Sequence, residues 1–495
     1  MSANALLHDG IAYWARRTPD MAAIRVDDDP PVTYAELARW SDGVAALLQA
    51  RGVEPGDRVA IAAGNCPAWA AAAVGVLKAG ATIVPFNDRL VAAELAWLAD
   101  HAQPRLIIAD EALAGRLASC AVPLLPLAQL DACRGGAGEG WRDVRVEAEE
   151  IAMIIFTSGS TSKPKGAMMS HANYAAKYHE MRLLDRRLGP GTRSLMPFGM
   201  HSSPGLPWGI LFTTTLGGTL HCTRKYEAER LFDTLVRERI DFFIGVPMIY
   251  QQIADLPGFA QADFSALTFA RVGGATPEDR TLAAWRAVGV AVRQLYGMTE
   301  VGGGSLIATE EEALAHPDSC GRGLAYTRVR IVRDDGSECD AAEPGHVLLR
   351  GPGMMSGYWR DPEASAVALA DGWMHTGDIG SVDAAGYFRF HDRAKEMIKS
   401  GGFNVSPSEI ERVLLDHPAI LEAAVFGVPD DKFSEAPCAC LHVTGDLSQE
   451  SVAEYCAQRL AGFKRPRRIV IMDGPLPRLA NEKIDRARLK ALYRD

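Results

Sequence analysis

The sequence predicts an α/β protein whose large N-terminal domain holds parallel sheets and a small antiparallel β subdomain, followed by a small α+β C-terminal domain. From about residue 58 to residue 306, short apolar segments alternate with helical ones, as in parallel sheets that are covered on both faces. After Cys320 the pattern changes to short strands between Gly, Asp and Pro residues, which favours antiparallel structure. The 495 residues allow two to four structural units.

The first elements follow from local signals. Thr33 and Glu36 have the spacing of a capping box, which predicts a helix over residues 34–49. Strands are then expected at 58–63, 82–85 and 105–109, with helices at 67–77 and 91–100. The Gly-rich segment 134–140 is expected to be a surface loop.

The second half divides into two parts. Buried strands are expected at 153–156 and 242–246, and short antiparallel strands at 329–332, 346–350 and 387–390. The last hundred residues predict helices at 407–415 and 450–460 and strands at 423–428, 439–443 and 468–472. We therefore expect a large domain over 1–391, a connection at 392–395 and a small domain over 396–495.

Composition excludes several classes of protein. The net charge of −10 disfavours a chain built mainly to bind nucleic acid or anionic lipid. Nine cysteines without a C-x-x-C motif indicate free thiols in a reducing compartment, and Cys438 and Cys440 are expected on one face of a strand. No segment approaches the ~18 apolar residues that span a bilayer, and no secretory signal is evident. A cytoplasmic location is expected.

The most informative segment is 156–166, because residues 157–162 are all Ser, Thr or Gly and directly follow an apolar strand. Hydroxyls, backbone N–H groups and lysines can together bind an anion, although many such stretches are ordinary surface loops. Pro164 stands where a Walker A loop requires glycine. No dinucleotide motif occurs, and the Ser-x-x-Lys matches lack their companion motifs.

Segment 157–166, continued to Ser170 and His171, resembles the phosphate loop of the adenylate-forming superfamily, which includes acyl-CoA synthetases, peptide-synthetase adenylation domains and beetle luciferases. Further segments resemble the motifs of this family in the same order; they are 296–300, 357–359, 373–378, 392–395 and 400–405, with weaker matches at 84–87 and 273–275. The resemblance spans nearly the whole chain.

The resemblance implies that ATP and Mg²⁺ activate a carboxylic acid as acyl-AMP, and that the acyl group then passes to the thiol of coenzyme A. It also implies that the C-terminal domain is a mobile lid with its hinge at Lys395. The implied ATP- and AMP-binding residues are Thr157, Ser158, Gly159, Ser160, Thr161, Lys165, Gly274, Ala275, Tyr296, Gly297, Thr299, Asp378, Arg393 and Lys483. Glu300 would hold the metal, Asp378 and Arg393 the ribose, and Lys483 the reacting carboxylate.

The same resemblance assigns the other substrates. The implied acyl pocket contains His201, Val246, Gly273, Gly274, Met298 and Gly302, and the implied catalytic residues are Lys483, Thr299, Glu300 and His201. The implied coenzyme A site contains Lys399, Ser400, Gly401 and Gly402. No acidic residue occurs between Met196 and Leu206, which disfavours an amino acid as the substrate. The basic run 464–468 is either a solvated face or a contact for the phosphates of coenzyme A.

Several points stay open at this stage. Asn481 and Glu482 precede Lys483 where the family usually has Thr-Gly, and a neighbouring carboxylate competes for the lysine charge. One alternative is therefore a ligase that performs mainly the thioester-forming half. Others are transfer to a carrier-protein pantetheine, a luciferase-like oxygenase and a binding protein with an inactive site. The acid is not identified by the sequence, and a homodimer is possible.

Overall fold

The computed structural model describes residues 6–135, 141–157, 164–400, 403–430, 434–479 and 483–493. The chain divides into two compact units. Unit 1 contains Met1–Val329 and Leu349–Met374, and unit 2 contains Arg330–Leu348 and His375–Asp495. The predicted domain boundary at 391/392 and the hinge at Lys395 stay predictions; both fall within unit 2.

The first sheet of unit 1 has six strands in the order β6-β5-β3-β4-β7-β8. All neighbours are parallel except β7 and β8, which form an antiparallel pair. The strands are β3 (Arg58–Ala62), β4 (Thr82–Phe86), β5 (Leu106–Ala109), β6 (Leu124–Pro126), β7 (Ile151–Thr157) and β8 (Lys165–Ser170). The helices of this region are α2 (Tyr34–Ala50), α3 (Pro67–Lys78), α4 (Ala92–Ala102) and α5 (Glu111–Arg116).

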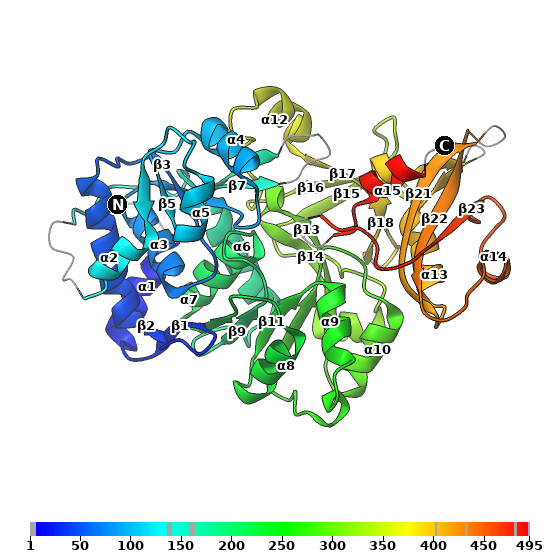
Figure 1. Ribbon diagram of the computed structural model, residues 1–495, viewed down its shortest axis with the longest axis horizontal. Coiled ribbons are helices and arrows are strands. Elements are labelled where there is room, and N and C mark those ends of the chain that lie inside the picture. The colour runs from blue at the N-terminus through cyan, green and yellow to red at the C-terminus, as the bar shows by residue number, and fades with distance from the viewer. Residues whose placement is uncertain are drawn as a thin grey trace. The chain divides into compact units, whose positions relative to one another are not determined.

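The second sheet of unit 1 has eight strands in the order β14-β13-β12-β11-β9-β10-β1-β2 (Figure 1). They are β1 (Ala22–Val26), β2 (Val32–Thr33), β9 (Arg193–Met196), β10 (Thr219–Cys222), β11 (Phe242–Gly245), β12 (Phe269–Val272), β13 (Val292–Met298) and β14 (Gly303–Ile307). Its helices are α1 (Asp9–Arg17), α6 (His171–Leu184), α7 (Thr213–Leu216), α8 (Ala228–Arg237), α9 (Pro247–Ala254), α10 (Asp279–Ala287) and α11 (Glu310–Ala315). The segment before α12 (Pro362–Ala368) pairs with the first sheet, through a bridge between Ala167 and Tyr358. A π-helix over Pro204–Phe212 continues directly into α7.

Unit 2 holds most of a four-stranded sheet and the whole of a five-stranded one. The first has the order β15-β16-β17-β18, formed by Arg328–Val332, Gly345–Arg350, Met374–Val382 and Phe388–Arg393. The second contains β19 (Ile398–Ser400), β20 (Phe403–Val405), β21 (Ile420–Asp430), β22 (Ser434–Val443) and β23 (Arg468–Met472). Its helices are α13 (Pro407–Leu415), α14 (Gln449–Ala457) and α15 (Arg486–Leu492).

These sheets confirm the predicted fold class: parallel sheets in the N-terminal part, an antiparallel sheet after it and an α+β C-terminal part. The predicted capping box begins α2, and α13 and β23 have the predicted bounds. Cys438 and Cys440 lie on β22 and are both fully buried, and all nine cysteines are free thiols. Residues 136–140 of the expected Gly-rich loop lie outside the described residues.

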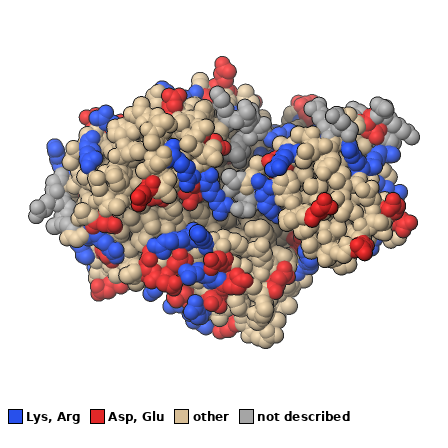
Figure 2. Space-filling view, in the orientation of Figure 1, with Lys and Arg blue, Asp and Glu red and all other residues tan. Residues whose placement is uncertain are grey.

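The basic run near β23 contacts its own unit. The Lys464 ammonium lies 2.6 Å from a Glu409 carboxylate oxygen, and Arg465 donates to the carbonyl groups of Leu460 and Ala457. These side chains therefore have structural partners, and a role toward coenzyme A stays untested. Figure 2 shows acidic and basic side chains interspersed on a visible face that other residues mostly form. Within the described part of the chain, no helix is both long and apolar enough to cross a membrane.

Candidate active site

The β7–β8 hairpin in unit 1 positions the two ends of the predicted phosphate loop. Thr157 is the last residue of β7 and lies opposite Lys165, the first residue of β8. The register of the antiparallel pair therefore fixes where the loop leaves and re-enters the sheet. The predicted phosphate-binding residues Ser158, Gly159, Ser160 and Thr161 lie outside the described residues.

Glu300 is the centre of the polar contacts beside this hairpin. It lies on a 3-10 turn over Thr299–Val301 and is only 5% exposed. Its Oε1 atom accepts hydrogen bonds from the Thr157 hydroxyl and the Tyr358 hydroxyl, each at 3.1 Å. The Lys165 ammonium lies 5.2 Å from the centre of the Tyr358 ring. Thus the fold brings together Thr157, Lys165 and Glu300, three residues that the resemblance assigns to one site, and adds Tyr358; their binding roles stay predictions.

The Glu300 carboxylate and its surroundings fit a hard divalent cation as a ligand partner. A buried carboxylate needs compensating donors or a metal, and the contacts described above are both neutral hydroxyls. Within the described ranges, no group of three or more His, Cys, Asp or Glu side chains could hold a metal. A cation at Glu300 would therefore take its remaining ligands from phosphate oxygens and water, which is the usual environment of Mg²⁺ beside a nucleotide.

The turn after Glu300 depends on glycine. Gly302 and Gly303 have φ angles of +74° and +93°, in the left-handed region that glycine adopts without strain. Gly297 pairs with Gly304 across β13 and β14, and a Cβ atom on Gly297 would lie 1.9 Å from the Gly303 carbonyl oxygen. The glycines therefore permit the close approach of backbone to backbone that folds Thr299 and Glu300 over the end of β13.

Two other predicted binding segments lie at the ends of neighbouring strands in the same sheet. Gly273 and Gly274 follow β12, and Val246 follows β11. A Cβ atom on Gly274 would contact the Val246 side chain at 3.6 Å, so these two predicted acyl-pocket residues are neighbours. Tyr296, one of the predicted ATP- and AMP-binding residues, is buried on β13.

His201 is partly buried next to an acidic residue from elsewhere in the sequence. Its Nδ1 atom lies 3.7 Å from a carboxylate oxygen of Asp88, and Gly199 leaves room for its ring. Burial lowers the pKa of His201, whereas the Asp88 carboxylate raises it. The local sequence contains no acidic residue between Met196 and Leu206, so only the fold reveals this neighbour.

The predicted sites in unit 2 include a tight ion pair. Arg393 Nε lies 2.8 Å from Asp378 Oδ1, because the two residues face each other across β17 and β18. Partial desolvation and the Arg393 and Arg486 guanidinium groups lower the pKa of Lys483, while the carboxylates of Glu396 and Asp378 raise it.

The remaining predicted residues of unit 2 lie on short elements. Lys395 lies in the 3-10 turn Ala394–Glu396, and the predicted coenzyme A residue Ser400 is the last residue of β19. Lys399 lies on the same strand. Gly401, Gly402, Asn481 and Glu482 lie outside the described residues.

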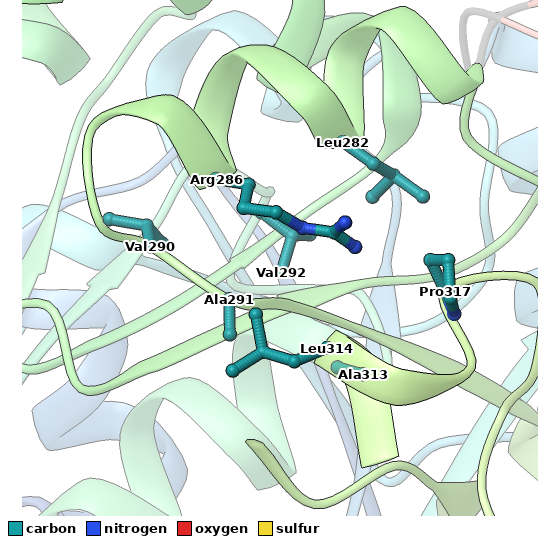
Figure 3. Close-up of a pocket in the computed structure, with 8 residues that line it drawn as sticks. All are labelled: Leu282, Arg286, Val290, Ala291, Val292, Ala313, Leu314 and Pro317. Carbon is teal, nitrogen blue, oxygen red and sulfur yellow. The ribbon is translucent and has the colours of Figure 1, made fainter. Parts of the chain in front are cut away.

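Two pockets occur away from these residues. One is lined by Leu282, Arg286, Val292, Leu314 and their neighbours, and its volume of about 10 Å³ accommodates about one water molecule (Figure 3). The other, of about 320 Å³, is lined by residues that include Arg58, Thr82, His171 and Trp359. Neither pocket is lined by a residue predicted to bind substrate.

Two family models together cover most of the chain. Residues 11–359 match the family model "AMP-binding enzyme", and residues 409–483 match "AMP-binding enzyme C-terminal domain". The chain is 35% identical over 487 residues to a feruloyl-CoA synthase of an Amycolatopsis species, with 96% of this chain and 98% of that protein covered.

Two solved structures share the whole fold. One is the o-succinylbenzoate CoA synthetase of Bacillus subtilis in complex with its acyl-adenylate intermediate, with a TM-score of 0.87, 26% identity and 97% of each chain covered. The other is ATP-bound MatB from Rhodopseudomonas palustris, with a TM-score of 0.90, 27% identity and 99% of each chain covered. The fold and site thus define a nucleotide-dependent, adenylate-forming enzyme. The chain belongs to the AMP-binding enzyme family, as its motifs predict.

Tyr358 is the contact of Glu300 that sequence reasoning missed. It stands in a segment that resembles a family motif, but nothing in its local sequence indicates a partner 58 residues away. The glycine before it is a local sign in the sequence of a constrained backbone, and in the structure Gly357 has a φ angle of +141°.

Proposed function

We propose that this protein is an AMP-forming acyl-CoA synthetase, which activates a carboxylic acid with ATP and transfers the acyl group to coenzyme A. The observation that carries the proposal is the buried Glu300 carboxylate, joined to Thr157 at the end of the phosphate-loop hairpin. Relatives of similar length that are named CoA synthases or synthetases support the same activity.

The chain supplies distinct groups for the first step. A carboxylate and a triphosphate are both anions, so the site must neutralise charge before the acid oxygen can approach the α-phosphorus. We assign the β- and γ-phosphates to the loop 157–165 and the α-phosphate to Thr299. Asp378 and Arg393 are assigned to the ribose, and Lys483 to the reacting carboxylate; for Lys483 the lowered pKa is compatible with a site that gathers several cations.

We propose that Mg²⁺ binds at Glu300. When bound, this ion supplies positive charge to the phosphate oxygens. The hydroxyl groups of Thr157 and Tyr358 both donate to Oε1 of Glu300 and so hold the carboxylate in one orientation.

The acyl pocket is assigned to Val246, Gly273, Gly274, Met298 and Gly302, with His201 at its entrance. Val246 and the adjoining Gly274 give an apolar wall, which suits an aliphatic, alicyclic or aromatic acid. The relatives' names include acids as different as ferulate and o-succinylbenzoate, so the pocket and not the family determines the acid.

For the second step, we assign coenzyme A to Lys399, Ser400, Gly401 and Gly402 and the hinge to Lys395. A carrier-protein pantetheine is the alternative acceptor, and a homodimer stays possible. We propose a cytoplasmic location, which agrees with nine free cysteines.

The proposal is tested by incubating the full chain with ATP, Mg²⁺ and a panel of carboxylic acids, and trapping acyl-AMP with hydroxylamine. The same panel is assayed for thioester formation with coenzyme A and with a phosphopantetheinylated carrier protein. We expect at least one acid to give both hydroxamate and acyl-CoA. We expect Lys483→Ala to lose both products from free acid and ATP, and to keep thioester formation from supplied acyl-AMP. Thioester formation from supplied acyl-AMP, with no ATP-dependent hydroxamate from any acid, would instead identify a ligase of the second half-reaction.

A further inference from the structure

Trp208 connects the interior of unit 1 to the turn that carries Glu300. It lies in the π-helix Pro204–Phe212 and is 3% exposed. Its indole Nε1 donates a hydrogen bond of 3.1 Å to the carbonyl oxygen of Gly302, 94 residues further along the chain. A Cβ atom on Gly303 would lie 2.4 Å from the same nitrogen, so the turn rests directly on the indole edge.

The Trp208 ring is itself fixed on several sides. Tyr178 and Phe212 pack against it with ring centres 5.5 Å and 5.2 Å away. The Arg271 guanidinium carbon lies 5.1 Å from the centre of the ring, which is the geometry of a cation–π contact. An indole held in this way cannot turn its N–H group away from Gly302 without repacking its neighbours.

Arg271 is an unusual residue for a core, because its partners are almost all aromatic. It is 1% exposed on β12, and its guanidinium also lies 4.7 Å from the Phe242 ring centre and 5.5 Å from that of Phe269. Its side chain has a polar contact with the Met181 sulfur, at 3.6 Å, and within the described residues its Nε has no hydrogen-bond partner. A buried cation of this kind is costly, so a core that keeps it must gain something from its position.

A second buried charged group supports the same turn. The methylene chain of Lys177 would lie 2.9 Å from a Cβ atom on Gly302 and 2.2 Å from one on Gly353. Its ammonium is fixed at 3.0 Å from Glu180 Oε2, with both side chains fully buried. The Gly302 turn therefore packs on two immobilised side chains. Trp208 gives it a directed hydrogen bond, and Lys177 gives it packing alone.

We propose that Trp208, held in place by Arg271, is a positioning residue. It fixes the position of the Gly302 turn and thereby orients the Glu300 carboxylate toward magnesium-bound ATP. This inference rests on the proposed function, because it requires that Glu300 faces the metal. The physical reason is that Gly302 directly closes the 3-10 turn: its N–H donates to the Thr299 carbonyl at 3.0 Å. A shift of Gly302 therefore shifts Thr299 and Glu300, and misplaced catalytic groups lose effectiveness steeply.

The test replaces Trp208 by Phe, which keeps an aromatic ring and removes the N–H donor. The chain offers a matched control in Trp285→Phe. Trp285 is also buried, also packs on aromatic rings, and also donates from Nε1 to a backbone carbonyl, that of Tyr250 at 2.9 Å. The two substitutions thus delete the same interaction, and only Trp208 contacts the Glu300 turn.

Calorimetry measures the Kd of ATP for each protein in Mg²⁺ and in EDTA, without any acid present, and denaturation midpoints confirm that each variant is folded. We expect Trp208→Phe to weaken binding in Mg²⁺ by about 3- to 10-fold, the size of one hydrogen bond, with a smaller loss in EDTA. Trp285→Phe is expected to change only the denaturation midpoint. Equal Kd values for the two variants would overturn the inference.

A second variant covers the case in which Trp208→Phe does not fold. Arg271→Lys keeps the positive charge but loses the planar group that stacks on the indole, and we expect it to weaken binding in Mg²⁺ in the same direction. An unchanged Kd in folded Arg271→Lys would count against the proposal. Failure of the wild-type protein to bind ATP or to activate any acid would refute the proposed function itself, whereas active wild type with indifferent Trp208 variants would refute only this inference.

Discussion

Glu300 shows how much one buried carboxylate depends on its donors. Thr157 and Tyr358 both donate to the same oxygen, Oε1, so the carboxylate is oriented by two hydroxyls from distant parts of the chain. Two neutral hydrogen bonds orient a carboxylate without cancelling its charge, so the residue keeps its ability to bind a cation.

Replacing Glu300 by Gln removes the charge while keeping the size and one acceptor oxygen. Replacing a residue that only supports a metal ligand typically lowers metal affinity or activity by about 10- to 100-fold. We therefore expect loss of the carboxylate ligand itself to lower the rate of acyl-AMP formation by about 100-fold or more. Hydroxylamine trapping over a range of Mg²⁺ concentrations measures the change. Tyr358→Phe, which removes only one hydrogen-bond donor, is expected to lower this rate by a smaller factor. Full activity of Glu300→Gln would show that the metal binds elsewhere.

At the scale of single elements, the start of α2 shows that a local signal can fix a helix end. Thr33 Oγ1 accepts from the Glu36 backbone N–H at 3.2 Å, and Glu36 Oε2 accepts from the Thr33 N–H at 3.4 Å. The two bonds satisfy donors that a helix otherwise leaves unpaired. The helix then buries one face, with Leu37, Trp40 and Val44 among its fully covered residues.

Replacing Thr33 by Ala removes the hydroxyl acceptor. We expect a loss of about 1 kcal/mol in the free energy of unfolding, measured by urea denaturation of the full chain. Thr33→Ser retains the acceptor and is the matched control, expected within about 0.5 kcal/mol of wild type. A stability of Thr33→Ala equal to that of Thr33→Ser would mean that the side-chain oxygen contributes nothing to the helix end.

Across the whole molecule, buried neutral histidines link stability to pH. Burial lowers the pKa of His171 and of His221 to about 4, and burial together with the charge of His171 lowers that of His8 to about 3. The unfolded chain, with histidine pKa values near 6.5, therefore binds protons between about pH 6.5 and 4 that the folded chain does not.

The contribution of these histidines to the free energy of unfolding should accordingly be complete above pH 6.5 and decrease as the pH drops toward 4. The expected slope is about 1.4 kcal/mol per pH unit for each histidine that stays neutral in the fold, measured as the free energy of unfolding in urea at several pH values. His171→Gln should make the slope shallower, whereas replacing the exposed His179 by Gln should leave it unchanged. Parallel pH profiles for wild type and His171→Gln would contradict this account.

The sequence by itself determined the fold class, the family and many of the elements, and it named the candidate residues, because those signals are local: strands alternate with helices, caps have fixed spacing, and the phosphate loop is one continuous segment. The tertiary structure decided which of these residues meet. Thr157 and Glu300 are 143 residues apart, and Trp208 and Gly302 are 94 apart. Contacts over such separations depend on strand order and register, to which every residue of the core contributes, so no short segment encodes them. For the same reason Asp88 beside His201 and the buried Arg271 against Trp208 became visible only in the folded chain.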